Sequence, residues 1–600
     1  MPCHECAPPQ ALRSSGSRGI RRQESCSSRP RLLPAGSDRS AVTALLCVIT
    51  LWGGLASGQD TPPYERGAVA ADHPLASQAG VEILKRGGNV IDAAVATALT
   101  LSVVRPASSG MGGGGFLVHW DAARQEAVAW DYREQAPLAA TADMYANAPA
   151  GASEHGGLAV AVPGHVPGLC HILSERGTFT IQQVANLVLE LTGDGVPVDV
   201  VDINTQRELL AEFAKQPELK QRFSALWSGY LNAGVPWKAG DRFHSPQLAA
   251  LNALSRDGVD SFTTGAVAQS LLETCRAAGG IVTAADFAAV HPMRRLPLRA
   301  KWGDYEILTM PPPSSGGIAL VQTLQALEAW GQQPGHRPWR DLAEADRTHV
   351  LAETLKHAFA DRAEFLGDAD FVPVPVARLT GVAYARRIAE SIDLQRTRPA
   401  KEYGRFQVPD DGGTTHFCVM DAQGNAVSCT ETINLTYGSY VVDPQFGIVL
   451  NNQMDDFTSR PGEPNAFGLI QSANNAIAPK KKPLSSMTPT IILKDGRPVL
   501  LAGASGGPRI ITATIQTVLR VAELGQTANE AVSQPRLHHQ WQPHELLLER
   551  PLERLMEPLA ARGHAVKVIG SSAVSQAIRW TPAGLEPASD PRKHGRPAGY

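Results

Sequence analysis

Between residues 77 and 104, apolar residues recur at the spacing that is typical of a helix. Residues 77–85 predict a short helix, with Ser77 as its cap and two glycines after its end. Asn89 begins a second predicted helix, NVIDAAVATALTLSVV, whose apolar residues cover every side. A helix of this kind is expected to be buried. Residues 181–275 are also mostly helical in pattern, so the first half of the chain predicts many helices.

Alternation of apolar and polar residues, which is typical of strands, appears on both sides of residue 414. FLVHW and residues 124–137 alternate before it, and TTHFCVM and AVSCTETIN alternate after it. The last two segments flank a Gln-Gly-Asn turn and predict a hairpin. Further strands are predicted at GIVLNN, TIILKDG and PVLLAGAS, and further helices at residues 509–523 and 550–562. Strands and helices in both halves predict an α+β layered sandwich.

Composition narrows the class of protein. The 600 residues are 43% hydrophobic and 19% charged, as in ordinary globular proteins. This length allows a large buried core. The formal net charge of −3 gives no basic surface of the kind that binds nucleic acid, so we expect no nucleic-acid partner.

The first 58 residues differ from the rest of the chain. Residues 1–40 are rich in Arg and Ser, and residues 41–58 carry no charge and end in small residues. A basic segment, an apolar core and a small-residue end predict an export signal that is cleaved near Gly58. A retained membrane anchor is the alternative, although about 20 apolar residues are usual and two glycines interrupt the segment. We therefore expect an exported protein, periplasmic or extracellular, with membrane anchoring as the second option.

The glycine-rich loop SSGMGGGGF contains a GxGxxG motif at Gly110, Gly112 and Gly115. A dinucleotide site requires the order strand, loop, helix, so that the phosphates meet a helix N-terminus. Here the predicted order is helix, loop, strand, and no phosphate-loop lysine follows the glycines. We therefore expect these glycines to allow close packing of the backbone.

Four cysteines follow residue 58, at Cys170, Cys275, Cys418 and Cys429. Their spacing does not match that of a metal site. Cys418 and Cys429 flank the turn of the predicted hairpin, so they are either a disulfide of an exported protein or two buried small side chains. The pair His538 and His539 has no third ligand at a suitable spacing and is expected to be structural.

The polar, weakly patterned residues 396–413 predict an exposed connector, and the predicted hairpin starts directly after it. The sequence DDGGTTHF places Gly413 before Thr414 at this junction. In isolation, two threonines after two glycines are typical of the start of a strand. A chemical role for Thr414 requires a base beside its hydroxyl, because a threonine hydroxyl alone is a weak nucleophile.

Six motifs follow in order along the chain: DYREQAP, TTHF, NNQMDDF, PLSSMTPTI, GASGGPRII and LHHQW. Together they resemble the gamma-glutamyltransferase family, over about residues 64 to 600. This family belongs to the N-terminal nucleophile hydrolases, so the resemblance implies a four-layer αββα sandwich and maturation by self-cleavage. The implied scission lies between Gly413 and Thr414. It gives a large fragment, 59–413, and a small catalytic fragment, 414–600, which remain together as a heterodimer.

The resemblance also assigns the chemistry of the small fragment. After scission, Thr414 carries both the hydroxyl that attacks and a free α-amine, whose pKa of about 8 suits a base. Thr432 matches the threonine whose hydroxyl bonds the nucleophile. Gly506 and Gly507 match the oxyanion hole, where two backbone N–H groups meet the developing charge.

The same resemblance implies a pocket for a γ-glutamyl group, which carries a carboxylate and an ammonium. The matching residues are, for the carboxylate, Arg133, Ser485 and Ser486, and, for the ammonium, Asp456, Asn434 and Gln453. The planar guanidinium of an arginine suits a carboxylate because it can donate two parallel hydrogen bonds. Taken singly, such residues are equally typical of a surface ion pair, a turn or an acidic loop.

The resemblance implies an enzyme that transfers the γ-glutamyl group of glutathione and related compounds through an ester of Thr414. The acceptor is water, an amino acid or a peptide, and no metal or organic cofactor is implied. Two alternatives remain: a glutaryl or cephalosporin acylase of the same family, and a family member without catalysis. Two positions depart from the family pattern: Phe467, where a lid tyrosine is common, and Glu431, where an aromatic or small residue is common.

Overall fold

The computed structural model describes residues 63–403, 413–458 and 472–600. Three sequence predictions therefore fall outside the described residues, at least in part. They are the N-terminal signal at 1–58, the lid residue Phe467, and residues 404–412 of the connector. In the described part of the chain, no helix combines the length and the apolar character needed to cross a membrane.

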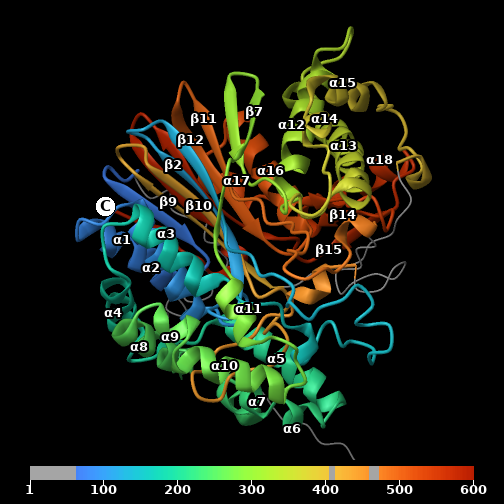
Figure 1. The fold of residues 1–600 in the computed structure, drawn as a ribbon. Helices are drawn as coiled ribbons and strands as arrows, with labels where there is room; N and C mark the ends of the chain where they lie inside the picture. Colours follow the sequence, from blue (N-terminus) through green and yellow to red (C-terminus); the bar gives the residue numbers. More distant parts are fainter. Residues whose placement is uncertain (1–62, 404–412, 459–471) are drawn as a thin grey trace, which may run out of the picture. The chain divides into compact units, whose positions relative to one another are not determined.

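The first sheet contains the predicted hairpin and joins strands from before and after Gly413 (Figure 1). In the described residues its spatial order is β18 (Ala598–Gly599), β1 (Gly67–Ala71), β9 (Thr414–Asp421), β10 (Ala426–Thr432), β2 (Gly114–Asp121), β3 (Glu126–Asp131) and β6 (Met293–Arg295). All neighbouring pairs are antiparallel. The hairpin β9–β10 thus lies between two strands of the N-terminal half, β1 and β2.

The second sheet is also antiparallel and packs face to face on the first. Its described strands are, in spatial order, β17 (Gly584–Ser589), β16 (Val574–Thr581), β12 (Arg497–Ser505), β11 (Thr490–Lys494), β8 (Tyr305–Thr309) and β7 (Leu298–Trp302). Apolar side chains such as Phe116 and Cys418 from one sheet, and Leu308 and Leu501 from the other, fill the space between them. Smaller sheets are formed by β13 (Leu537–His538), β14 (Leu546–Glu549) and β15 (Val566–Ile569), and by β4 (Val196–Pro197) and β5 (Arg242–Phe243).

Helices cover the outer face of each sheet (Figure 1). α1 (Pro74–Lys85) and α2 (Val90–Val104) pack on the first sheet, and a large apolar cluster fills this interface. α12 (Gly316–Gly331) and α16 (Arg509–Ala522) pack on the second sheet, and α13 (Glu344–Phe365) packs on α12. The apolar residues of each sheet are therefore buried on both faces, which provides a rigid support for the residues at the strand ends.

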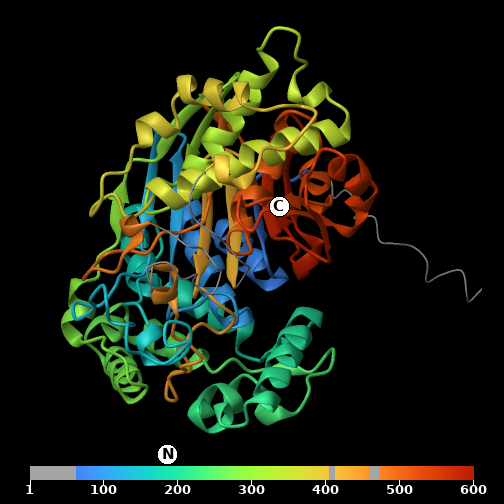
Figure 2. The ribbon, with the colours of Figure 1, turned by 90° about the vertical axis from the view of Figure 1, so that its right-hand side faces the viewer.

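The other helices of the described chain lie around these layers. They are α3 (His165–Arg176), α4 (Ile181–Thr192), α5 (Val200–Lys215), α6 (Leu219–Arg222), α7 (Ser224–Gly229), α8 (Leu248–Asp257), α9 (Asp260–Thr263), α10 (Ala266–Ala277), α11 (Ala284–Ala289), α14 (Val376–Leu379), α15 (Val382–Glu390), α17 (Ala528–Ser533) and α18 (Met556–Ala560). Figure 2 shows α5 to α7, in green, apart from both sheets. The mostly helical pattern of residues 181–275 is confirmed.

The two helices predicted near the start of the globular part exist, but one predicted cap is wrong. Asn89 caps α2 with a capping box that includes Asp92, and every residue of α2 is buried, as predicted. Ser77, in contrast, lies inside α1 and is buried. The helix starts at Pro74, and the ring nitrogen Nδ1 of His73 accepts from the N–H of Leu75 at 3.2 Å. Proline suits the first turn of a helix because its missing N–H would have no partner there.

Two other predicted elements differ from the structure. The segment GIVLNN forms no strand, and only isolated bridges join Val449 to Val442 and Leu450 to Gly112. The helix predicted at 550–562 is a 3₁₀ helix, Arg550–Leu555, followed by the short α18. Pro558 lacks the N–H that a continuous α-helix would need at this position, so the segment cannot form one regular helix. The strand predicted at 124–137 is confined to β3.

The hairpin is confirmed, but the disulfide alternative for its cysteines is wrong. Cys418 lies opposite Ser428, and Cys429 lies opposite Phe417. Because neighbouring positions on a strand face opposite sides of the sheet, the two thiols point in different directions. The four cysteines of the described chain are free and buried, so the alternative of small core side chains is confirmed.

The glycine loop packs closely on the backbone, as the sequence predicts. It connects α2 to β2, in the order helix, loop, strand. A Cβ atom at Gly112 would lie 2.1 Å from the carbonyl oxygen of Val449, and one at Gly113 would lie 2.2 Å from that of Thr432. No side chain fits at such distances. The loop therefore presses directly against the end of β10.

Candidate active site

Thr414 and Thr432 lie side by side because the hairpin register pairs them. Thr414 is the first residue of β9, Thr432 is the last residue of β10, and the two are direct neighbours across the strands. Both are buried, and their hydroxyl oxygens are 3.3 Å apart. The predicted nucleophile thus has a second hydroxyl within hydrogen-bond distance.

The Thr432 hydroxyl also contacts the peptide bond that the sequence predicts to break. It donates to the carbonyl oxygen of Gly413 at 2.8 Å and accepts from the backbone N–H of Asn434 at 2.8 Å. A hydrogen bond to a carbonyl oxygen stabilises the negative charge that develops when a nucleophile attacks its carbon. The Thr432 hydroxyl therefore contacts both the carbonyl oxygen of Gly413 and the hydroxyl of the predicted nucleophile, Thr414.

A lysine near the C-terminus fixes Thr414 from the other side. Lys593 donates to the carbonyl oxygen of Thr414 at 2.8 Å, and its amine pairs with Asp72 at 2.8 Å. Asp72 also accepts from Gln576 at 2.6 Å. Because all of these polar groups bond one another, the backbone of Thr414 is held in one position.

Charges of both signs meet close to Thr414. Arg133 follows β3, is buried, and donates from Nη2 to Asp456 at 2.5 Å and from Nε to the carbonyl of Pro483 at 2.8 Å. Gln453 donates to the same oxygen of Asp456 at 2.6 Å. Burial raises the pKa of Asp456 above its ordinary value, and the neighbouring Arg133 opposes this shift. Arg133, predicted to bind the carboxylate, and Asp456, predicted to bind the ammonium, therefore bond each other.

A cavity of about 30 Å³ collects nearly all of the residues that the sequence predicts for the site. The predicted residues that line it are Thr414, Thr432, Arg133, Asn434, Gln453, Asp456, Ser485, Ser486 and Gly507. Gly506 does not line it but precedes Gly507 between β12 and α16. Both glycines have positive φ angles, +128° and +50°, which favour glycine over other residues. The structure therefore brings the candidate set together from both sides of Gly413, whereas their roles remain proposals.

Comparison with known proteins identifies the same family that the sequence motifs resemble. The family described as Gamma-glutamyltranspeptidase matches residues 76–600. The chain belongs to the gamma-glutamyltranspeptidase family. It is 38% identical over 537 residues to the glutathione hydrolase proenzyme of Escherichia coli (strain K12), over 88% of this chain and 90% of that protein. It is 39% identical over 515 residues to the glutathione hydrolase proenzyme of Pseudomonas sp. (strain A14), over 84% of this chain and 87% of that protein.

A solved structure also shares the α+β fold of this family member. The crystal structure of cephalosporin acylase from Bacillus halodurans superposes with a TM-score of 0.79 and 23% sequence identity. The match covers 92% of this chain and 99% of that chain. At this identity the likeness concerns the fold, so the substrate must be argued from the side chains of the cavity.

Sequence reasoning missed two buried charged residues of this γ-glutamyltranspeptidase site. Arg362, in the last turn of α13, lines the cavity beside Ser486. Glu134 is fully buried next to Arg133, with 3.9 Å between the two charged groups, and among the described residues neither of its oxygens has a hydrogen-bond donor. Burial raises the pKa of Glu134 to about 7. In the sequence, Arg362 lies in a helix with many charged residues. Its position in the sequence pattern does not distinguish it from the charged residues that are exposed to solvent.

Glu431, which departs from the family pattern, points away from Thr414. It precedes Thr432 on β10, so its side chain lies on the opposite face of the sheet. There it is buried, accepts from the hydroxyl of Tyr132 at 2.9 Å, and lies 3.2 Å from Nε2 of His165. Burial raises the pKa of Tyr132 well above its ordinary value, and so does the nearby Glu431. This cluster therefore ties β10 to the residue before Arg133 without touching Thr414.

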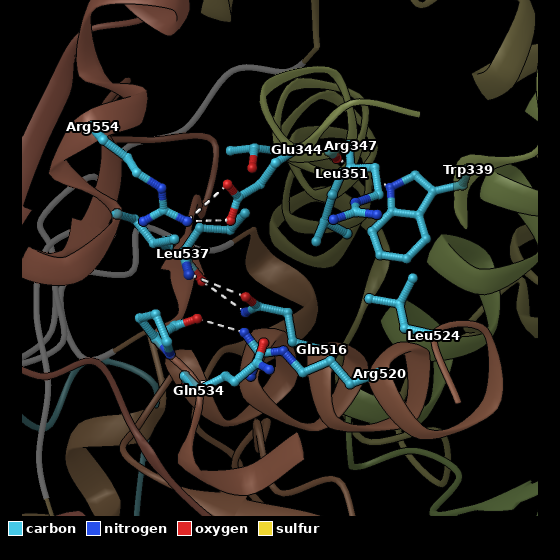
Figure 3. Close-up of a pocket in the computed structure, with 13 residues that line it drawn as sticks. Trp339, Glu344, Arg347, Leu351, Gln516, Arg520, Leu524, Gln534, Leu537 and Arg554 are labelled. Carbon is cyan, nitrogen blue, oxygen red and sulfur yellow. Dashed lines mark hydrogen bonds and ion pairs between the residues drawn. The ribbon is translucent and has the colours of Figure 1, made fainter. Parts of the chain in front are cut away.

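A larger cavity, of about 330 Å³, lies elsewhere, and we do not assign the chemistry to it (Figure 3). Its charged side chains already have partners. Arg554 pairs with Glu344 at 2.7 Å, and Arg520 donates to backbone carbonyls, including that of Ala531 at 3.0 Å. Arg347 donates to a backbone carbonyl at 3.2 Å and lies over the ring of Trp339. These contacts are typical of helix packing, not of a catalytic centre.

One buried cluster in the described chain has metal-binding residue types: His349, Glu353 and His564. Its carboxylate is already bonded, because Lys356 lies 2.5 Å from one oxygen of Glu353 and Tyr403 donates to the other at 2.5 Å. The cluster therefore has the character of a hydrogen-bond network.

His538 and His539 do not belong to this cluster. The ring nitrogens of His538 bond Thr512 at 2.9 Å and Gln540 at 2.7 Å. His539 accepts from the N–H of Trp541 at 3.1 Å. These bonds agree with the predicted structural role of the pair.

Proposed function

We propose that this member of the gamma-glutamyltranspeptidase family is a glutathione hydrolase and γ-glutamyltransferase that activates itself by scission between Gly413 and Thr414. One observation carries the proposal: the hydroxyl of Thr432 contacts both the hydroxyl of Thr414 and the carbonyl oxygen of Gly413. The two glutathione hydrolase proenzymes that resemble the chain support the choice of substrate.

Self-cleavage uses groups that are already in contact. The Thr414 hydroxyl attacks the carbonyl carbon of Gly413 and loses its proton. The C–N bond then breaks, the amine of Thr414 takes up a proton, and Gly413 becomes an ester of the Thr414 hydroxyl. Water hydrolyses this ester, which leaves a carboxylate on Gly413 and a free N-terminal threonine. The Thr432 hydroxyl stabilises the charge on the Gly413 oxygen during the attack.

The substrate binds through its charged end. The α-carboxylate bonds the guanidinium of Arg133 and the hydroxyls of Ser485 and Ser486, which line the same cavity. The α-ammonium bonds Asp456, with Gln453 and Asn434 beside it. Since Asp456 pairs with Arg133 in the structure, the incoming ammonium and carboxylate replace one ion pair by two.

The catalytic cycle then has two steps. The free amine of Thr414 accepts the proton of its own hydroxyl, which attacks the γ-carbonyl of the substrate. The N–H groups of Gly506 and Gly507 stabilise the oxygen of the tetrahedral intermediate, and the amine product leaves with a proton. Water attacks the resulting γ-glutamyl ester and releases glutamate, or an amino acid or peptide amine attacks it and receives the γ-glutamyl group.

We also propose how the two fragments assemble after scission and where the protein is located. The fragments 59–413 and 414–600 form a heterodimer within one four-layer αββα sandwich of the N-terminal nucleophile hydrolase type. The alternation of their strands in the first sheet supports this proposal. We also propose that the protein is exported, with residues 1–58 as the signal, because their composition favours this role.

A glutaryl or cephalosporin acylase of the same fold is the second candidate. A glutaryl group has a carboxylate but no ammonium, so it would leave Asp456 without a cationic substrate partner. A buried carboxylate without such a partner is unfavourable. The position of Asp456 in the cavity, bonded by Gln453, therefore favours the γ-glutamyl group.

Two measurements test the proposed function. On a denaturing gel, the purified wild type should give two fragments that correspond to residues before and after 413, and Thr414→Ala should give one uncut chain. The cut protein should release p-nitroaniline from γ-glutamyl-p-nitroanilide, and from a glutaryl anilide at a much lower rate. An uncut wild-type chain that nevertheless hydrolyses the γ-glutamyl anilide would refute the proposal.

A further inference from the structure

Arg362 is a buried cation that lines the cavity of Thr414 and, among the residues that the structure describes, has no acidic partner. Its side chain belongs to the last turn of α13 and is 2% exposed. Within 63–403, 413–458 and 472–600 no ion pair includes Arg362, and Asp456, which lines the same cavity, pairs with Arg133 instead. Because an uncompensated charge in the interior is costly, such a residue calls for an anion to bind beside it.

The hydrogen bonds of Arg362 leave one end of its guanidinium unused. Nε donates to the hydroxyl of Ser315 at 3.0 Å, and Nη2 contacts the hydroxyl of Ser486 at 3.5 Å. Nη1 is buried and has no partner among the described residues. An arginine has five N–H donors in a fixed plane, so the two contacts determine where Nη1 points. The side chain is therefore oriented on the wall of the cavity.

Two charged side chains, Arg133 and Asp456, lie near Arg362 on the same cavity. The pKa of Arg362 is lowered to about 10, chiefly by burial; the nearby Asp456 opposes this shift and Arg133 adds to it. Two guanidinium groups thus share one neighbouring carboxylate, Asp456. Arg133 already donates to Asp456 and to a backbone carbonyl, whereas Nη1 of Arg362 donates to neither.

We propose that Arg362 is a second guanidinium that binds the α-carboxylate of the substrate, through Nη1, while Nη2 orients the hydroxyl of Ser486. This inference rests on the proposed function and deepens it. Arg133 and Arg362 hold the carboxylate together, so the free carboxylate of the γ-glutamyl group becomes the feature that the site selects. Arg362 is in this sense a specificity-determining residue.

The test compares two substrates that differ only in this carboxylate. They are γ-glutamyl-p-nitroanilide and 4-aminobutanoyl-p-nitroanilide, which keeps the amine and the anilide but lacks the α-carboxylate. The variants are Arg362→Met and Arg362→Lys in the full chain. Arg347→Met is the matched control, because Arg347 lies in the first turn of the same helix and faces the larger cavity of Figure 3.

We expect the ratio of kcat/KM between the γ-glutamyl and the 4-aminobutanoyl substrates to fall about 100-fold in Arg362→Met, since a buried charge partner is lost. Arg362→Lys should keep part of the ratio, because a lysine supplies the charge without the planar fork. Arg347→Met should leave the ratio unchanged. An equal loss on both substrates, or no loss on the γ-glutamyl substrate, would overturn the inference.

Failure of the proposed function has a different signature. In that case the wild type would process neither substrate, or would prefer the anilide without the α-carboxylate. If Arg362→Met does not cut itself, it cannot be assayed. In that case the test is a crystal structure of the wild-type enzyme with bound glutamate. Nη1 within about 3.2 Å of a carboxylate oxygen supports the inference, and a separation beyond about 4 Å overturns it.

Discussion

At the scale of single residues, the hydroxyl of Thr432 contacts both groups that would react in the proposed self-cleavage. Its removal in Thr432→Ala deletes the donor to the Gly413 oxygen and the partner of the Thr414 hydroxyl. We expect self-cleavage to slow about 100-fold, as is typical when an oxyanion donor is lost. The ratio of precursor to fragments, followed on denaturing gels over time, measures this rate.

A neighbour on the same strand provides the control for Thr432. Thr430 is also buried on β10, but its hydroxyl bonds His416 at 2.8 Å and not the scissile peptide. Thr430→Ala should therefore cut at nearly the wild-type rate. Equal slowing in both variants would mean that the effect comes from a disturbed strand and not from the lost donor.

Glu134 should make stability depend on pH. Its pKa in the folded protein is about 7, whereas an ordinary glutamate has a pKa of 4.5. Between these two pH values the folded protein therefore keeps the carboxyl proton that the unfolded chain has lost. Where the folded state binds more protons, the free energy of unfolding falls as pH rises. Glu134→Gln should remove this fall and stabilise the protein more at pH 8 than at pH 5, by roughly 1–3 kcal/mol. Urea denaturation at the two pH values measures the difference, and an equal effect at both would contradict the assignment.

The sequence predicts most residues of the site because they lie in short motifs that resemble a known family. It does not predict how Arg133 and Asp456 bond each other, because 323 positions separate them. Arg362 also escapes prediction, since its local pattern is that of any charged helix residue. Its burial results from the packing of α13 on α12, which no local spacing encodes.

At the scale of elements, the glycine loop before β2 supports the end of β10. A methyl group at Gly113 would meet the carbonyl oxygen of Thr432 at 2.2 Å. Gly113→Ala should therefore displace Thr432 and slow the proposed self-cleavage by about tenfold or more, since a small misplacement of a reacting group is costly. Gly570→Ala is the control, because nothing lies within 4 Å of the added carbon there. A gel that shows normal cutting of the Gly113 variant would refute this role of the loop.

Prediction of elements succeeds where two local signals agree. The hairpin has both alternation and a turn, and α2 has both a cap and a continuous apolar pattern. It fails where one signal stands alone. GIVLNN is apolar, but it forms only isolated bridges to residues outside the strands. The segment 550–562 has the spacing of a helix, but proline interrupts it. The opposed thiols of Cys418 and Cys429 follow from the register, which cysteine spacing does not contain.

At the scale of the whole molecule, strands from both sides of Gly413 alternate within the first sheet. β9 and β10 lie between β1 and β2, and β18 lies on the far side of β1. After scission, the proposed fragments should elute together in size exclusion and unfold in one calorimetric transition, because separation would break several strand ladders at once. Fragments that separate under native conditions would contradict the interlocked arrangement.

The sequence gives the α+β class but not the order of strands in the sheets. That order depends on contacts between distant segments, such as β1 with β18 near the two ends of the described chain. The cavity depends on it as well, because its walls come from before and after residue 413. Only the three-dimensional packing explains why motifs so far apart act on one cavity.

The bond from Lys593 to the carbonyl of Thr414 has a consequence for the timing of maturation. Lys593 is translated long after Thr414, so a nascent chain still held on the ribosome before this point lacks the contact. Strands β12, β16 and β17, which form half of the second sheet, are also late in translation. Scission should therefore be a post-translational event, and polypeptides stalled before residue 590 should remain in one piece.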